Sequence, residues 1–556
     1  MSVNRIAQDD ANRPAAGRLT RRLNLGLTTC LLLSTLLVGG PGTGAAASSY
    51  DPSEDGYSMA NVTSQMGASA WWDAGYTGAG VDVAVIDTGV TAVPALSGAG
   101  KVVYGPDLSL ESQSPSLRNL DSYGHGTFMA GLIAGHDSSL NVPYSQAPAT
   151  AYRGVAPDAR IVSVKVGTTD GGADVTQVIA AIDWVVQHAH DPGLNIRIIN
   201  LSYGTDSSQS YTIDPLAYAA EQAWKHGIVV VAAAGNTGFQ RGHGAPGLAD
   251  PAYDPYVIGV GGYDTGGTAA LHDDSIGSYS ASANEGHAKK PDFVAPGSHL
   301  QGLRVPGSYI DDNNPQAALD ANYMHGSGTS EATAITSGAI ALILQRYPTL
   351  TPDEVKQFIQ QDSQKLPGAS DQAQGSGELN LTAMLYDAPQ GFSKPPTPPT
   401  PVPAPLIVLQ PANPPTYTLQ GPPAPAANYP DSSGNGSLEA SRGSDHLTQS
   451  GRELTGPFDI FGHPFDVTAI AQAEAQGNAW SGGIFNGNAW NGNGSAGTSW
   501  AGNSRSGNSW SGNSWSGNSW SGNSWSGNSW SGNSWSGNSW SGNSWSGSGW
   551  ASETWN

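Results

Sequence analysis

The sequence predicts an α/β domain of three layers built on a largely parallel β-sheet. Short, nearly continuous apolar runs occur at residues 81–86, 161–166, 198–201, 228–233 and 257–260. Helical patterns separate most of these runs, an order typical of parallel strands joined by helices. Because the runs hardly alternate with polar residues, we expect a sheet that is buried on both faces. Ligands of such sheets bind at the carboxyl ends of the strands.

The expected helices are placed by their caps and by apolar periodicity. They fall at residues 128–134, 174–186, 215–224, 330–343 and from 351 onward. Asp174-Val175-Thr176-Gln177 has the form of a capping box. Thr351 is followed by a first-turn proline and two acidic residues, which is a typical helix start.

Charge and cysteine content narrow the class of protein. The 556 residues have a formal net charge of -22 and a pI of about 4.7, which argues against a nucleic-acid partner. The sole cysteine is Cys30. It lies in a segment that we expect to be removed, so the mature chain would have no disulfide and no cysteine metal site.

The first residues have the pattern of an export signal. Four arginines between residues 13 and 22 precede the apolar run Leu25–Val38, and Ala45–Ala47 resembles a cleavage site. The run is too short for a comfortable membrane span, so we expect no transmembrane helix in the mature chain. Thr20–Leu23 leaves both the general and the twin-arginine export routes open.

Three polar residues stand in glycine-rich frames at expected strand or helix ends. They are Asp87 in Asp-Thr-Gly, His125 in Gly-His-Gly-Thr, and Ser330 in Gly-Thr-Ser. Each alone has an ordinary alternative: a turn aspartate, a helix-capping histidine and an N-cap serine. Together they form a chemical set, because a serine nucleophile needs a base and the base needs a third group to orient it.

Seven short blocks extend this pattern along the chain. They are V-A-V-I-D-T-G, G-H-G-T, G-V-A-P, I-N-L-S-Y-G, A-A-A-G-N, P-D-F-V-A-P-G and G-S-G-T-S. In this order, from Gly67 to Asp387, they resemble the subtilisin-like serine peptidases (subtilases). The order Asp, His, Ser is also that of subtilisin.

The resemblance implies a role for each matching residue. Ser330 is the nucleophile, His125 the general base, and Asp87 the group that orients the base. Asn236 donates to the oxyanion. The substrate pairs as an added strand along Ser202, Tyr203 and Gly204 on one side and Gly171 and Gly172 on the other; Asn236 and the two glycines have turn and loop alternatives. Ala249 and Asp250 are expected near the main specificity pocket, and the chemistry requires no cofactor.

Some positions depart from the family pattern. Glu331 and Ala334 replace the usual methionine and proline, and Phe128 and Ile335 also stand at altered positions. Val93–Leu96 replaces H-P-D-L, so the metal ligands are unknown and structural calcium stays open. Between Ala47 and Gly67 the sequence leaves no room for the usual inhibitory propeptide.

Composition divides the chain into five parts. We expect a signal peptide at 1–47, a short extension at 48–66, the peptidase domain at 67–387, a Pro-rich and polar linker at 388–475, and a repeat tail at 476–556. The tail repeats Ser-Gly-Asn-Ser-Trp, a period of five that fits neither helix nor strand. A flexible tail, a turn-rich solenoid and an adhesive aromatic array are the alternatives.

The sequence thus predicts a secreted serine endopeptidase that acts on polypeptides, outside the cell or at its wall. One rival is an inactive peptidase that serves as a binding module, against which the complete set of catalytic residues argues. The other is an adhesive protein whose tail binds cell-wall glycan or another surface polymer. Separate expression of the tail would distinguish this second rival.

Overall fold

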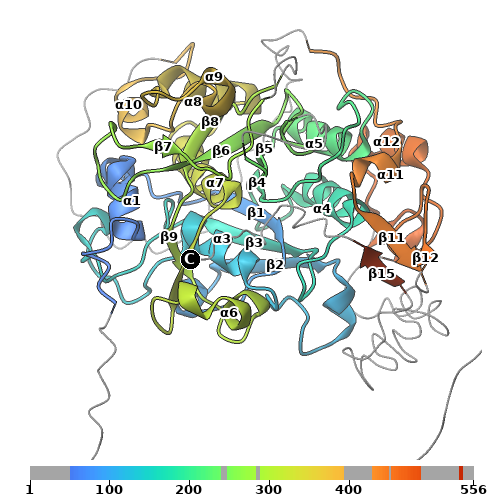
Figure 1. Cartoon of the computed structure of the whole chain (residues 1–556), viewed down its shortest axis with the longest axis horizontal. Coiled ribbons are helices and arrows are strands. Elements are labelled where there is room, and N and C mark those ends of the chain that lie inside the picture. Colours follow the sequence, from blue (N-terminus) through green and yellow to red (C-terminus); the bar gives the residue numbers. More distant parts are fainter. Residues whose placement is uncertain are drawn as a thin grey trace, which may run out of the picture. The chain divides into compact units, whose positions relative to one another are not determined.

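Within the part of the chain that the structure describes, an eight-stranded β-sheet forms the centre of the molecule (Figure 1). The computed structural model describes residues 50–238, 247–283, 289–392, 429–449, 452–481, 483–489 and 538–541. These residues all belong to one unit, which begins at Tyr50. The predicted signal peptide, residues 1–47, lies outside them.

The sheet is parallel except at one edge. Its order is β2 (Val102–Asp107), β3 (Arg160–Lys165), β1 (Asp82–Asp87), β4 (Ile196–Leu201), β5 (Val229–Ala233), β6 (Ile258–Asp264) and β7 (Ser275–Ile276), and β8 (Phe293–Pro296) also pairs with β6. Only the β6–β7 pair is antiparallel among these described strands. The predicted α/β class with a largely parallel sheet is therefore confirmed. Edge strand β2 was not predicted, because it contains Gly105 and Pro106 and leaves Tyr104 exposed.

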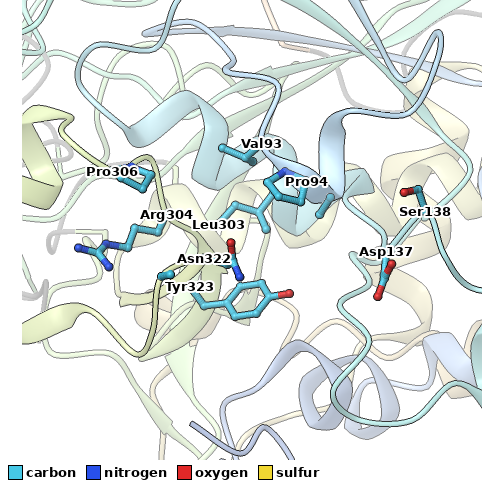
Figure 2. Close-up of a pocket in the computed structure, with 11 residues that line it drawn as sticks. Val93, Pro94, Asp137, Ser138, Leu303, Arg304, Pro306, Asn322 and Tyr323 are labelled. Carbon is cyan, nitrogen blue, oxygen red and sulfur yellow. The ribbon is translucent and has the colours of Figure 1, made fainter. Parts of the chain in front are cut away.

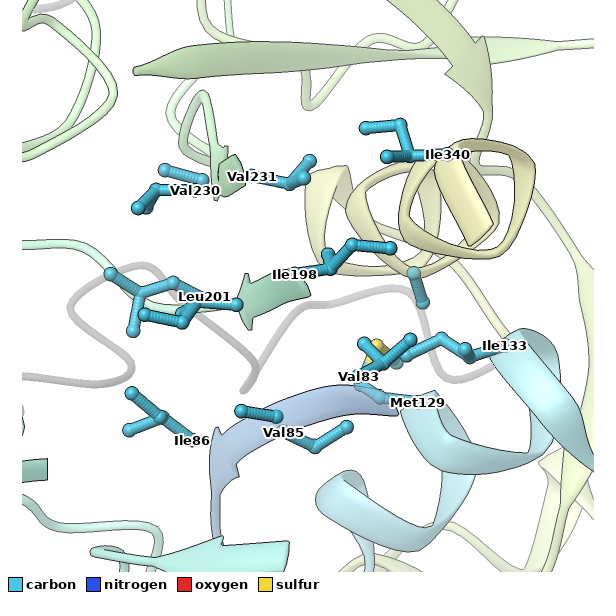
Figure 3. Packing of buried hydrophobic residues seen from close by; sticks show 14 of the residues in the cluster. Val83, Val85, Ile86, Met129, Ile133, Ile198, Leu201, Val230, Val231 and Ile340 are labelled. Carbon is cyan, nitrogen blue, oxygen red and sulfur yellow. The ribbon is translucent and has the colours of Figure 1, made fainter. Parts of the chain in front are cut away.

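Helices on both faces bury this sheet. Helices α3 (His125–Ala134) and α7 (Thr329–Arg346) pack against each other and against strands of the sheet. Helices α4 (Val175–His188) and α5 (Pro215–Lys225) form a second packed pair. Figure 3 shows Met129 and Ile133 of α3 beside Val83 of β1. All residues of β1, β4 and β5 are buried, as expected for the middle layer of three.

Smaller elements complete the domain. They are α1 (Met59–Gln65), α2 (Ala68–Asp73), α6 (Tyr309–Asn313), α8 (Pro352–Asp362), α9 (Asp371–Gln374), α10 (Leu381–Tyr386), and the antiparallel hairpin of β9 (Leu300–Leu303) and β10 (Tyr323–Gly326). Met59 and Val62 of α1 have no exposed surface. The described part of the predicted extension 48–66 therefore belongs to the folded domain.

Residues 429–489 also fold onto this domain, and we call their described part the docked segment. It contains α11 (Leu438–Ser441), β11 (His446–Gln449), β12 (Arg452–Glu453), α12 (Val467–Glu474), β13 (Ile484–Phe485) and β14 (Asn488–Ala489). Helices α11 and α12 pack against α5. Its buried apolar side chains join the main core: Leu438, Ile460, Phe465, Trp480 and Phe485.

This finding corrects two predicted boundaries. The linker predicted at 388–475 is folded from 429 onward, and the tail predicted from 476 begins with residues that are part of the core. The apolar residues of this segment are few and widely spaced, so the sequence shows no separate core. They join the core of the domain, and Phe465 and Phe485 also contact each other with ring centroids 6.0 Å apart. In the repeat itself, β15 (Asn538–Ser541) pairs with β11.

Among the described residues, no helix has the length and apolar character needed to cross a membrane.

Candidate active site

Asp87 and His125 lie next to each other at the carboxyl end of β1 and the first residue of α3. Nδ1 of His125 is 2.9 Å from one carboxylate oxygen of Asp87 and 3.1 Å from the other. This contact favours the tautomer in which Nε2 accepts a proton. Burial lowers the pKa of His125 well below its ordinary value. The imidazole is therefore neutral at neutral pH, as a general base must be.

A hydrogen-bond network centred on Asp121 fixes the turn that carries His125. The Asp121 carboxylate accepts hydrogen bonds of 2.7–2.8 Å from the Thr88 hydroxyl, the Gly124 N–H, and the N–H and hydroxyl of Thr127. The N–H of Thr88 in turn donates to Asp87 at 2.7 Å. One network thus holds both Asp87 and His125. Asp121 was not among the predicted site residues, although its position four residues before His125 offered a signal.

Ser330 lies in the first turn of α7 and is 3% exposed. The unpaired N–H groups and the dipole of a helix N-terminus favour negative charge there. The Ser330 hydroxyl is 3.4 Å from the carbonyl oxygen of Ser202, and the Ser202 hydroxyl donates to the Ser330 carbonyl at 3.1 Å. These contacts fix the start of α7 against the end of β4, while α3 packs along α7.

Asn236 follows β5 and is oriented by the residue before Ser330. Its side-chain oxygen accepts two hydrogen bonds of 2.8 Å, from the N–H and the hydroxyl of Thr329. The same hydroxyl accepts from the N–H of Gly235 at 3.1 Å. These two contacts orient the Asn236 amide, with its oxygen facing Thr329 and its NH₂ group, the part of the amide that can donate to an oxyanion, turned away from Thr329.

Glu331 introduces a buried carboxyl group beside this amide. A Cβ atom at Gly328 would lie 2.8 Å from Oε2 of Glu331 and 3.0 Å from Nδ2 of Asn236, so both groups lie against the same glycine. Burial, with a smaller contribution from Asp87, raises the pKa of Glu331 to about 8. Glu331 is therefore mainly neutral at neutral pH.

The residues predicted to bind substrate lie in two loops. Gly171 and Gly172 follow β3, in a turn where Thr168 donates its N–H to the Gly172 carbonyl at 3.1 Å. Ser202, Tyr203 and Gly204 follow β4. Tyr203 is 1% exposed, so its side chain is not available to a ligand. A Cβ at Gly204 would lie 2.6 Å from that of Ala249, which places Ala249 beside this loop.

A pocket of about 310 Å³ lies elsewhere (Figure 2). Its lining includes Val93, Pro94, Leu303, Arg304 and Tyr323 but no histidine and none of the predicted site residues. Without a histidine to act as a base, the pocket lacks the pair of groups that serine hydrolysis requires.

The described residues contain no group of three or more His, Cys, Asp or Glu side chains that could hold a metal ion. Val93 and Ala95 also lack the side-chain oxygen ligands that calcium prefers. Residues Val93–Leu96 therefore supply no set of side-chain ligands for the structural calcium that the sequence leaves open.

The parallel sheet and the geometry around Asp87, His125 and Ser330 contain the components of a serine hydrolase. The Subtilase family model matches residues 78–377. The chain is 37% identical over 308 residues to serine protease AprX of Bacillus subtilis (strain 168), covering 55% of this chain and 66% of AprX. It is 31% identical over 320 residues to Subtilisin BL of Lederbergia lenta, covering 58% of this chain and 96% of that protein.

The chain belongs to the subtilase family and is a subtilisin-like serine endopeptidase. Among solved structures, a cold adapted subtilisin-like serine proteinase has 29% sequence identity and a TM-score of 0.39. That comparison covers 55% of this chain and 88% of the other.

Proposed function

We propose that the chain is a secreted endopeptidase in which Ser330, His125 and Asp87 act together on extended polypeptides. The observation that supports this most strongly is the 2.9 Å contact between Nδ1 of His125 and Asp87, buried in a network beside the start of α7. A neutral imidazole held in one tautomer is the base that a serine nucleophile needs.

The reaction would proceed in two halves. The Ser330 oxygen attacks the peptide carbonyl carbon while its proton passes to Nε2 of His125, and the resulting oxyanion accepts hydrogen bonds from the Ser330 N–H and from the Asn236 amide. The C–N bond then breaks, and His125 gives the proton to the leaving amine. Water repeats the sequence on the acyl-enzyme and releases Ser330. Asp87 stabilises the imidazolium whenever His125 holds the transferred proton, and no cofactor takes part.

The substrate would bind as an added strand between two backbone edges. One edge is Gly171–Gly172 and the other is Ser202–Gly204, both at carboxyl ends of parallel strands, where such sheets bind ligands. With the Tyr203 side chain buried, backbone hydrogen bonds would supply most of the affinity, and side-chain pockets beside Ala249 would supply the preference.

Two further proposals concern location. The arginines and apolar run of residues 13–47 support export and removal of the leader. Terminal sequencing of the extracellular protein tests this proposal, and a start far from Ala47 would contradict it.

The second proposal concerns the tryptophan repeats after residue 489. They would bind cell-wall glycan or another surface polymer, because indole stacks on sugar rings and many weak contacts act together.

The catalytic proposal is tested with a random peptide library and the purified mature protein. We expect internal peptide bonds to be cleaved by the wild type and by a Thr333→Ser variant, whose altered hydroxyl points back to its own helix at Thr329. The Ser330→Ala variant should leave the library intact. Equal cleavage by Ser330→Ala would contradict the proposed nucleophile.

A further inference from the structure

The docked segment reaches the domain at two helix N-termini that lie next to the proposed substrate edges. Asp174 caps α4, and Asp214 caps α5. Ser441 and Arg442, at the end of α11, each bind one of these capping carboxylates. The proposed reaction uses neither residue.

Arg442 is 2% exposed, and two nitrogens of its guanidinium donate hydrogen bonds to the Asp174 carboxylate. Its Nε donates to Oδ1 of Asp174 at 2.7 Å, and a terminal nitrogen donates to Oδ2 at 3.2 Å. The other contacts are with Glu439 at 2.9 Å and the carbonyl of Phe458 at 2.6 Å. A guanidinium with this many acceptors has one allowed position, so it also fixes the position of Asp174.

Asp174 transmits this constraint to the first substrate edge. Only Ala173 separates it from Gly172. Asp174 also accepts the N–H of Thr176 at 3.1 Å in the capping box of α4, so it cannot shift without disturbing that helix start. The position of Gly172 relative to α4 therefore depends on the ion pair between Asp174 and Arg442.

Ser441 makes the equivalent connection to the second edge. Its hydroxyl donates to Asp214 at 2.7 Å and lies 3.3 Å from a carboxyl oxygen of Asp250. Its carbonyl accepts the hydroxyl of Thr205 at 2.7 Å. Thr205, which follows Gly204, exchanges two backbone hydrogen bonds of 3.0 Å with Asp250. Ser441 thus holds the loop that continues the second edge.

Tyr203, the middle residue of the second edge, is influenced by charged groups of both connections. Burial raises the pKa of its hydroxyl; the charges of Asp174 and Asp250 raise it further, and Arg442 lowers it. The phenol is therefore within electrostatic reach of the ion pair at one edge and of Asp250 at the other.

We propose that Ser441 and Arg442 are positioning residues that hold the two substrate edges at the separation an extended peptide requires. The proposal rests on the proposed function, because it assumes that substrate binds between these edges. It assigns to the docked segment a part in substrate affinity. A short substrate that reaches only Ser330 would not depend on this separation.

The test compares two substrates in the full-length enzyme. One is a four-residue peptide anilide, which spans about 13 Å as a strand, and the other is an ester of a single acylated amino acid. Each uses the residues preferred in the library. We expect Arg442→Met to raise the KM of the tetrapeptide about tenfold, to leave kcat nearly unchanged, and to leave the ester KM within about twofold. Arg442→Lys, which keeps the charge but not the two-pronged contact, should give an intermediate KM.

Two further variants separate positioning from loss of folding. Asp174→Asn/Arg442→Met removes both charges and leaves a capping side chain, so it should fold and still show the raised tetrapeptide KM. Arg197→Met is the matched control, because Arg197 binds the carbonyls of Pro348 and Leu350 instead of a substrate edge. It should lower the thermal midpoint without changing the ratio of the two KM values.

The results distinguish this proposal from the one on which it rests. If the wild type hydrolyses neither substrate, the proposed function fails. If the wild type hydrolyses both and the KM ratio of the folded Asp174→Asn/Arg442→Met variant equals that of the wild type, the positioning role fails. An equal rise of both KM values would also contradict it.

Discussion

The sheet domain and the docked segment bury their residues in different ways. Strands β1, β4 and β5 are buried along their whole length, mainly through Val, Ile, Leu and Ala side chains. The docked segment contributes scattered apolar side chains and attaches through polar contacts, such as Arg442 with Asp174 and Ser432 with Glu221. Burial of apolar side chains stabilises the fold without requiring a particular contact geometry. Removing one partner of a buried ion pair, in contrast, strongly destabilises the fold, because the other charge is left buried and unpaired.

The difference indicates a division of roles. The sheet carries Asp87 at the end of β1, where it contacts His125 of α3, and Ser330 of α7 contacts Ser202, which follows β4. The docked segment supplies no proposed catalytic group. It donates hydrogen bonds to buried carboxylates of the domain, Asp174 and Glu221. Variants of the catalytic residues should therefore reduce turnover without unfolding, and changes in the docked segment should reduce stability or substrate affinity.

The largest effect is expected from the proposed triad. Ser330→Ala, His125→Ala and the double variant should all reduce kcat by a similar factor, on the order of 10⁶, which is the loss that the equivalent substitutions produce in subtilisin. Their thermal midpoints should stay near that of the wild type. Steady-state kinetics and thermal denaturation check both points, and an additive loss in the double variant would contradict action as a unit.

Truncation should separate the two regions by stability. Ending the chain after Asp387 leaves Asp174 without Arg442, and loss of one partner of a buried pair costs about 3–5 kcal/mol. We expect much less folded enzyme and a lower thermal midpoint. The matched control ends after Ala489, which keeps the docked segment but removes β15, and it should retain wild-type turnover and a thermal midpoint well above that of the shorter form. Equal stability of the two truncated forms would contradict a structural role of the docked segment.

Removal of the proposed oxyanion donor should lower kcat with little change in KM. For Asn236→Ala we expect a loss of about 10²–10³-fold, the range that the corresponding substitution produces in subtilisin. Asn195→Ala is a suitable control, because Asn195 donates to the carbonyl of Gly80 at the opposite end of the sheet. An unchanged kcat in Asn236→Ala would show that another group binds the oxyanion.

The smallest effect is a pH dependence set by Glu331. Its pKa of about 8 means that a negative charge develops beside Asn236 above that pH, which should oppose the oxyanion. We expect kcat/KM to fall up to tenfold per pH unit there, and Glu331→Gln to remove this decline. The pKa of Glu331 is about 8 in the folded state and about 4.3 in the unfolded chain. The neutral carboxyl therefore contributes fully to folding stability below about pH 4.3, and this contribution is lost progressively as the pH rises to about 8. Identical pH profiles would contradict the assignment.

The sequence could predict the sheet because each central strand is a local apolar run, and it could nominate Asp87, His125 and Ser330 because each lies in a local motif. It could not predict the docked segment. Arg442 and Asp174 are 268 residues apart, and nothing in either local pattern indicates an ion pair. Asp121 was missed for a related reason, since its role depends on contacts with Thr88 and Thr127 that form only in the fold.

The most direct test of the proposed catalytic centre is covalent labelling by a serine-directed phosphonofluoridate, followed by peptide mass spectrometry. We expect one adduct, on the peptide that contains Ser330, at a rate that falls steeply in His125→Ala. An adduct on another serine, or equal labelling rates in the wild type and His125→Ala, would contradict a centre in which His125 activates Ser330.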